Sequence, residues 1–133
     1  MKRATKIFLI VAACILASCA SAPVLPENIS SAELIQRGQE AVDAGRYTQA
    51  IQYFQAILDR FPGDLPMICN AEYEIAHTYY KQKKYGQARQ ELHALLSRYE
   101  GEDAELLPPH FKRLAEILLD TIGDDPAAGT GET

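Results

Sequence analysis

The chain has 133 residues, a length that fits one ordinary domain or a small array of repeats. It carries 13 basic and 18 acidic residues, for a formal net charge of −5 at pH 7. Nucleic-acid phosphates need clustered Lys and Arg, and anionic lipid surfaces attract basic segments, so this acidic balance argues against both as direct ligands.

The first 18 residues have the parts of a secretory signal peptide. Lys2, Arg3 and Lys6 form a basic head, and an apolar run follows at residues 7–17. About eleven residues at 1.5 Å each cover about 17 Å, which is too short for a hydrocarbon core of about 30 Å. We therefore expect residues 1–18 to be cleaved as a signal and not to span a membrane.

Leu16-Ala17-Ser18-Cys19 at the end of this segment resembles the lipobox of bacterial lipoproteins. The resemblance implies that the Cys19 thiol is acylated, with diacylglycerol and palmitate as the usual groups, and becomes the new amino terminus. Two or more acyl chains hold a protein on a membrane durably. An ordinary secretory signal cut nearby is the alternative. In enterobacteria, an Asp directly after the lipidated cysteine retains a lipoprotein in the inner membrane. Ala20 stands at this position, which favours a location in the outer membrane, facing the periplasm.

Residues 19–30 contain two prolines and show no helical period, so we expect a lipidated tether. Beyond it, two segments share a Tyr-x-x-Ala core 38 residues apart, with Tyr47 and Ala50 in the first and Tyr85 and Ala88 in the second. Apolar residues three and four apart lie on both sides of each core, which predicts two amphipathic helices joined by a short turn. The fold class is therefore predicted to be all-α.

These hairpins resemble tetratricopeptide repeats (TPRs). Gly38 and Ala76 fall on the small position of the first helix, where a missing side chain lets the two helices of a hairpin approach closely. The resemblance implies a short superhelix of two repeats, at residues 31–62 and 69–100. Envelope TPR lipoproteins of the outer-membrane β-barrel assembly type look similar over residues 31–99.

The spacing of 38 residues exceeds the 34 of an ordinary TPR. We place the four extra residues in the connection at 62–67. Three positions depart from the TPR pattern, because Arg37 replaces a Leu, Glu72 a large apolar residue and Glu100 a terminal Pro.

Residues 105–122 predict one more amphipathic helix with no second helix after it, and such a helix caps the apolar end of a repeat stack. Its residues Phe111, Leu114, Ala115 and Leu118 align with Glu72, Ile75, Ala76 and Tyr79 of the second repeat. The tail at residues 123–133 is rich in Gly, Ala, Thr and acidic residues, and we expect it to be disordered.

In a TPR stack, the inner face of the first helices lines a groove that takes the partner. By register, the candidate partner-binding residues on this face are Gln39, Asn70, Tyr73, His77, Tyr80 and Lys81. The flanking groove positions of the first repeat are Ala32, Ile35, Val42 and Asp43. On the capping helix the corresponding positions are Pro109, Lys112, Glu116, Leu119 and Asp120. Rings with polar tips and a cation suit an extended or helical peptide. The alternative is that the two tyrosines pack against neighbouring helices while the histidine and the lysine are merely solvated.

Nothing in the sequence predicts an enzyme, a cofactor or a metal site. The three histidines are scattered, and neither a His-Glu-x-x-His pattern nor a phosphate-binding Gly loop nor a Gly-x-Ser-x-Gly elbow occurs. Glu74 and His77 have the i, i+3 spacing of carboxylate-bridged metal sites, but no second Glu-x-x-His supplies the remaining ligands. Cys69 is expected to be a small apolar core residue, with an intermolecular disulfide as the alternative.

Together these features predict a membrane-anchored TPR scaffold that mediates protein–protein interaction in the bacterial cell envelope, with a periplasmic or membrane protein as partner. The alternative is a structural subunit that self-associates through exposed helix faces and has no separate peptide ligand. A concentration-dependent mass would favour this alternative, and a monomer with an open groove would favour the scaffold.

Overall fold

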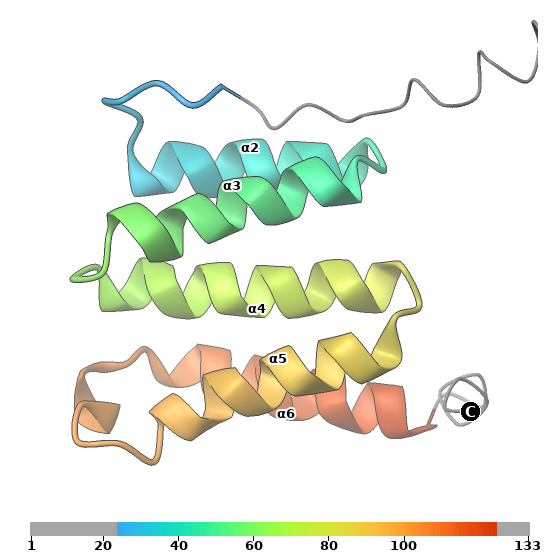
Figure 1. Cartoon of the computed structure of the whole chain (residues 1–133). Coiled ribbons are helices and arrows are strands. Elements are labelled where there is room, and N and C mark those ends of the chain that lie inside the picture. Colours follow the sequence, from blue (N-terminus) through green and yellow to red (C-terminus); the bar gives the residue numbers. More distant parts are fainter. Residues whose placement is uncertain (1–23, 125–133) are drawn as a thin grey trace, which may run out of the picture.

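The computed structural model describes residues 24–124, in which all regular structure is helical. The α-helices are α2 (Ser31–Asp43), α3 (Tyr47–Arg60), α4 (Leu65–Lys81), α5 (Tyr85–Arg98) and α6 (Pro109–Asp124), and a short 3-10 helix η2 (Ala104–Leu106) precedes α6. From α2 to α5 they follow one another down the molecule in chain order, and α6 lies behind α5 (Figure 1). The prediction of an all-α, TPR-like stack is confirmed. The predicted signal peptide, Cys19 and residues 125–133 of the predicted tail lie outside the described residues.

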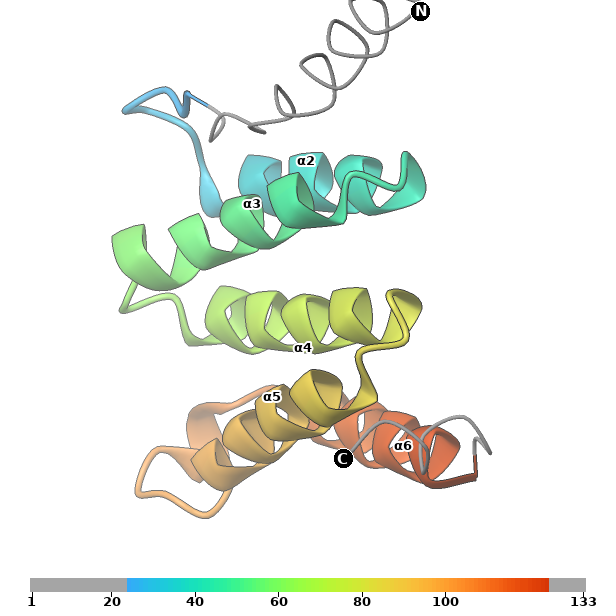
Figure 2. The same cartoon turned by 45° about the vertical axis from the view of Figure 1, so that its right-hand side comes forward.

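The helices form two layers. Helix α4 contacts α2 and α6 as well as its neighbours α3 and α5. Figure 2 shows α3 and α5 standing in front of α2 and α6. The first helices of the repeats, α2 and α4, therefore share one side of the stack with α6. Within residues 24–124, no helix is both long and apolar enough to cross a membrane.

The close approach of α2 and α3 depends on Gly38. A Cβ atom at Gly38 would lie 2.2 Å from Cε1 of the Phe54 ring, and Phe54 is fully buried. Ala76 and Ala88 are also fully buried, on facing helices of the second hairpin. Gly38 and Ala76 thus occupy the small-residue positions that the TPR resemblance implied.

The core consists of two clusters that share α4. The first packs α2 and α3 against Ala71 and Ile75 of α4. The second packs α5 and α6 against Cys69 and Ala76 of α4. Cys69 is fully buried, in agreement with the expected apolar core residue. Two faces of one helix therefore hold the two halves of the molecule together.

The start of α2 shows why residues 24–30 are not a free tether. Ser30 accepts a hydrogen bond on Oγ from the Glu33 backbone N–H at 3.1 Å. Ile29, one residue before this N-cap, is buried in the same cluster as Leu34, as in a hydrophobic staple. The Arg60 guanidinium donates a hydrogen bond to the Pro26 carbonyl at 3.0 Å. The predicted tether was therefore wrong for its last residues, which pack on the first repeat.

Two predicted boundaries were also wrong. Helix α4 begins at Leu65, with Asp64 as its N-cap, so the extra residues of this repeat lengthen the helix and do not lie in a connection at 62–67. A Pro in the first turn is compatible with this start, because its missing N–H has no intrahelical partner there. Helix α6 runs from Pro109 to Asp124, later at both ends than the predicted 105–122, because residues 104–106 form the separate turn η2.

Candidate partner-binding groove

A cavity of about 300 Å³ opens between α2 and α4 on the first-helix side of the stack. It is lined by Gln39, Val42, Asp43, Tyr73, Glu74, His77 and Lys81. Four of the predicted partner-binding residues therefore meet here, namely Gln39, Tyr73, His77 and Lys81. Asn70 and Tyr80 do not line the cavity. The sequence analysis missed Glu74 as a lining residue, although its i, i+3 spacing to His77 had been noted.

Glu74 connects the two walls of the cavity. Its Oε1 accepts a hydrogen bond from Nε2 of Gln39 at 2.7 Å, and its Oε2 lies 4.0 Å from Nδ1 of His77. Burial lowers the pKa of His77 below 6.5, and Lys81 lowers it further, while the Glu74 carboxylate acts in the opposite direction. His77 is therefore neutral near pH 7 and offers a ring nitrogen as hydrogen-bond acceptor.

The rings of α4 form a continuous row. Tyr73 stacks on His77 at a centroid distance of 6.0 Å, and His77 stacks on Tyr80 at 6.2 Å. The row continues from Tyr73 to Phe111 of α6 at 6.3 Å and from Tyr80 to Tyr85 of α5 at 5.9 Å. Tyr73 and Tyr80 therefore contribute to packing, and the His77 side chain between them is 33% exposed and lines the cavity.

The predicted groove positions on the capping helix are wrong by one residue. Phe111, Ala115 and Leu118 of α6 are buried with the spacing of Ala71, Ile75 and Thr78 of α4, an offset of 40 and not the 39 used for the alignment. One residue rotates a helix by about 100°. The shift of one residue moves the groove-side positions from Pro109, Lys112, Glu116, Leu119 and Asp120 to His110, Arg113, Ile117, Asp120 and Thr121. Leu114 takes the place of Glu74 and is exposed, whereas the alignment had placed it at the position of the buried Ile75.

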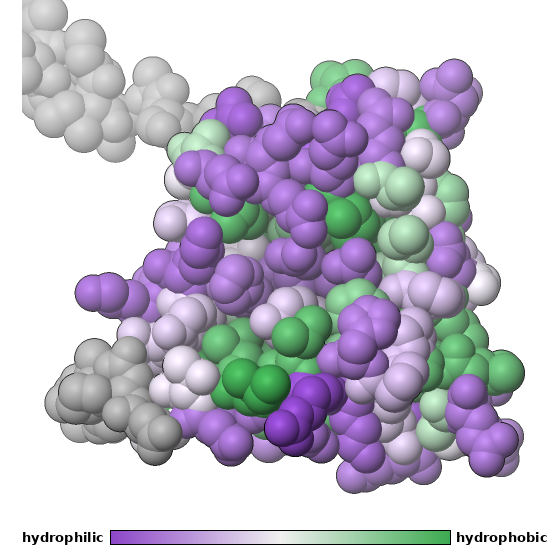
Figure 3. Space-filling model, turned by 180° about the vertical axis from the view of Figure 1, so that it is seen from behind, coloured by the Kyte–Doolittle hydropathy of each residue, from purple (hydrophilic) through white to green (hydrophobic). Residues whose placement is uncertain are grey.

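The groove face has two chemical halves. Figure 3 shows the molecule from behind, where polar side chains dominate over the middle of the face and hydrophobic side chains gather lower down, over α6. Leu114 and Ile117 are 37% and 48% exposed. The polar half is the α2–α4 cavity, and the apolar half continues onto α6.

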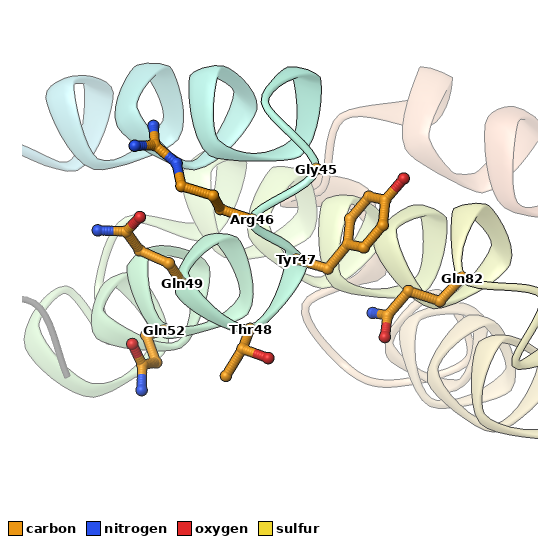
Figure 4. A pocket seen from close by; sticks show the side chains of 7 residues that line it. All are labelled: Gly45, Arg46, Tyr47, Thr48, Gln49, Gln52 and Gln82. Atoms are coloured by element: carbon orange, nitrogen blue, oxygen red, sulfur yellow. The ribbon is translucent and has the colours of Figure 1, made fainter. Parts of the chain in front are cut away.

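A second cavity, of about 450 Å³, lies at the turn between α2 and α3 and is lined by Gly45, Arg46, Tyr47, Thr48, Gln49, Gln52 and Gln82. No predicted site residue belongs to it. Figure 4 shows Tyr47 on the side of α3 where Gln82, from the end of α4, lies, while Arg46 and Gln49 extend to the other side. Because these polar groups diverge, they do not form a converging set of ligand contacts.

An ion pair between Arg98 and Glu72 joins α5 to α4. Arg98 donates hydrogen bonds from Nε and Nη2 to the Glu72 carboxylate at 2.6–2.9 Å, and the Glu72 side chain is only 13% exposed. This bond explains why Glu72 can stand where a TPR has a large apolar residue. Within residues 24–124, no cluster of three or more His, Cys, Asp or Glu side chains is arranged to hold a metal ion.

Comparison with known proteins places the chain among outer membrane lipoproteins. The model of the family YfiO, described as outer membrane lipoprotein, matches residues 27–105. An uncharacterized protein of Treponema pallidum (strain Nichols) is 39% identical over 108 residues, which cover 79% of this chain and 43% of that protein. The chain therefore spans less than half the length of this relative. No solved structure is significantly similar.

Proposed function

The chain belongs to the YfiO family of outer membrane lipoproteins, and on that premise we propose that it is a lipid-anchored, non-catalytic TPR scaffold that binds a protein partner in the bacterial cell envelope. The observation that carries this proposal is the cavity between α2 and α4, in which polar groups of two first helices converge next to a row of rings.

Attachment is proposed to be through acyl chains on Cys19. With the chain fixed to the packed surface from about Leu25 onward, about five residues separate the lipid from the first repeat. Such a segment spans at most about 20 Å when extended. The groove would therefore stay close to the membrane, facing the periplasm if the anchor lies in the outer membrane, and a membrane protein or a periplasmic segment near the membrane is the expected partner.

The groove walls define the chemistry of the proposed ligand. The neutral ring of His77 accepts a hydrogen bond, the ring faces of Tyr73 and His77 offer apolar contact, and the exposed Asp43 and Lys81 stand at the rim with opposite charges. A peptide segment with backbone N–H groups and one apolar or aromatic anchor matches these groups. Because Glu74 is already bonded to Gln39, it is expected to position the wall and not to contact the ligand directly.

The test is capture of a partner from detergent-solubilised envelopes by the lipidated protein, with bound proteins identified by mass spectrometry. Variants Asp43→Lys and Lys81→Glu change the groove rim at exposed positions, so they should leave the fold intact. They are preferable to Tyr73→Ala and Tyr80→Ala, because both tyrosines also pack against neighbouring helices.

Asp59→Lys is the matched control, since Asp59 is also an exposed acid near a helix carboxyl end but belongs to α3, on the other layer. A partner captured by the parent chain and by Asp59→Lys, and lost with either groove variant, would support the groove. Equal capture by all four chains would remove the groove as the binding site. Recovery from the soluble fraction after Cys19→Ser would test the anchor separately.

A further inference from the structure

Helix α6 presents an exposed face with the spacing of a coiled-coil seam. His110, Leu114, Ile117 and Thr121 are all exposed and follow one another at intervals of four, three and four residues. This is the spacing of alternating a and d positions in a heptad. The opposite face of α6 is occupied, because Phe111, Ala115, Leu118 and Ile122 are buried in the second core cluster.

Charged residues flank the two apolar positions of this seam on one side. With Leu114 and Ile117 at a and d, Arg113 and Asp120 both fall on g positions, one heptad apart, and both are exposed. In an antiparallel pair of identical helices, g positions face g positions, so Arg113 of each helix meets Asp120 of the other. In a parallel pair, g faces e, where Leu118 is already buried in its own core and offers no charge.

We propose that α6 is a self-association surface, on which two copies of this chain pack antiparallel through Leu114 and Ile117. In this arrangement Leu114 of each copy contacts Ile117 of the other, and two symmetric Arg113–Asp120 pairs fix the register. The same patch is used twice around a two-fold axis, as in most homodimers. A second copy is the occupant because the seam is complementary to itself in both apolar spacing and charge.

The dimer is expected to be weak in free solution, because only two apolar positions per copy are available and His110 and Thr121 bound the seam. If the chain is anchored to a membrane as proposed, confinement raises its effective concentration without adding contacts. The seam also lies on the groove side of the stack, next to Tyr73 of α4 through Phe111. Self-association and partner binding should therefore compete.

The experiment is sedimentation equilibrium of the full chain in density-matched detergent over a wide concentration range. The parent should show a reversible monomer–dimer equilibrium. Arg113→Asp and Asp120→Arg each turn two attractive pairs into two like-charged pairs, so each should raise the dimer dissociation constant by about tenfold. An equimolar mixture of the two variants should recover parental affinity, because both pairs are restored between unlike chains.

Lys112→Asp is the matched control, since it makes the same charge change at an exposed position on α6 outside the seam. It should leave the equilibrium unchanged, and helical circular dichroism should be the same in all variants. A parent that is monomeric at every concentration would overturn the proposal, as would single variants that match the control or a mixture that fails to recover. The proposed function is judged separately, because Asp43→Lys and Lys81→Glu lie on α2 and α4, outside the seam, and should lose the groove partner while keeping the parental monomer–dimer equilibrium.

Discussion

Replacing Gly38 with Ala is the most direct test of how the first repeat is packed. Its new methyl group would lie 2.2, 2.6 and 2.8 Å from three atoms of the Phe54 ring, where ordinary carbon contacts are about 3.5–4.0 Å. The ring is fully buried in the cluster that contains Ala50 and Ile57, so it has no free space to enter. We therefore expect an overpacking cost in the upper part of the usual range, about 2–3 kcal/mol.

The same substitution gains about 1 kcal/mol from helix propensity, because Ala restricts the unfolded chain more than Gly. The net expectation is a loss of about 1–2 kcal/mol in the free energy of unfolding, measured by urea titration with circular dichroism. For a folded unit of this size, that loss corresponds to a fall in Tm of about 5–15 °C.

Gly123→Ala is the matched control, since Gly123 is also helical and no atom lies within 4 Å of the point where its Cβ atom would be. It should be neutral or slightly stabilising. In a Phe54→Leu background, where the ring is absent, Gly38→Ala should cost at least about 1 kcal/mol less than in the parent. Stabilisation by Gly38→Ala in the parent, comparable to the control, would refute the packing argument.

Two contacts of α4 and the turn before α5 can each be tested by one substitution. Glu72→Gln removes the charge that accepts the Arg98 hydrogen bonds. Because Arg98 is 41% exposed, the free energy of unfolding measured by urea titration should fall by only about 1 kcal/mol. An unchanged free energy of unfolding would mean that the ion pair does not stabilise the fold. Burial lowers the pKa of His77, so the folded state favours the neutral imidazole and the free energy of unfolding should fall as the pH drops below 6.5, the ordinary value. This fall should be smaller in His77→Gln. An equal dependence of stability on pH in both chains would contradict the lowered pKa. Lys83 has a φ of 60°, the counterpart of Gly45 at 70° in the first hairpin, so Lys83→Gly should raise Tm by a few degrees, and a lower Tm would show that the turn is not strained.

The sequence alone predicted the packing of the two helices within each hairpin, because that packing recurs in both repeats. The pairs Gly38 with Ala76 and Tyr47 with Tyr85 recur at one spacing, and each recurrence reflects the same contact between two consecutive helices. Packing within a hairpin depends on residues close in the chain, so periodicity predicted it well. The same register identified six of the seven residues that line the cavity, because α2 and α4 are repeats of each other.

What could not be predicted lies where the repeat pattern ends. The alignment of α6 assumed that Ala115 plays the part of Ala76, which keeps room for a following helix. No helix follows α6 among the described residues, and Ala115 instead packs toward the preceding repeat with the spacing of Ile75. The one-residue error moved every predicted contact of this helix by more than a quarter turn.

The starts of α4 and α2 could have been predicted from local capping residues, but the TPR pattern was followed instead. Asp64 followed by a Pro in the first turn is a normal helix start, and it predicts α4 from Leu65 once the TPR length is set aside. Ile29, Ser30 and Glu33 likewise carry the staple and capping pattern that pins the start of α2. In both places the local capping chemistry was the better guide than the family pattern.

The sharing of α4 between the two core clusters has a consequence for how the molecule comes apart. Loss of the first cluster frees α2 and α3 but leaves α4 covered by α5 and α6, and loss of the second leaves it covered by α2 and α3. The backbone amides of α4 can exchange with solvent only when both clusters open. Among the helices of residues 24–124, α4 should therefore be the last to lose its structure, and the groove wall built on it should persist through partial opening at either end.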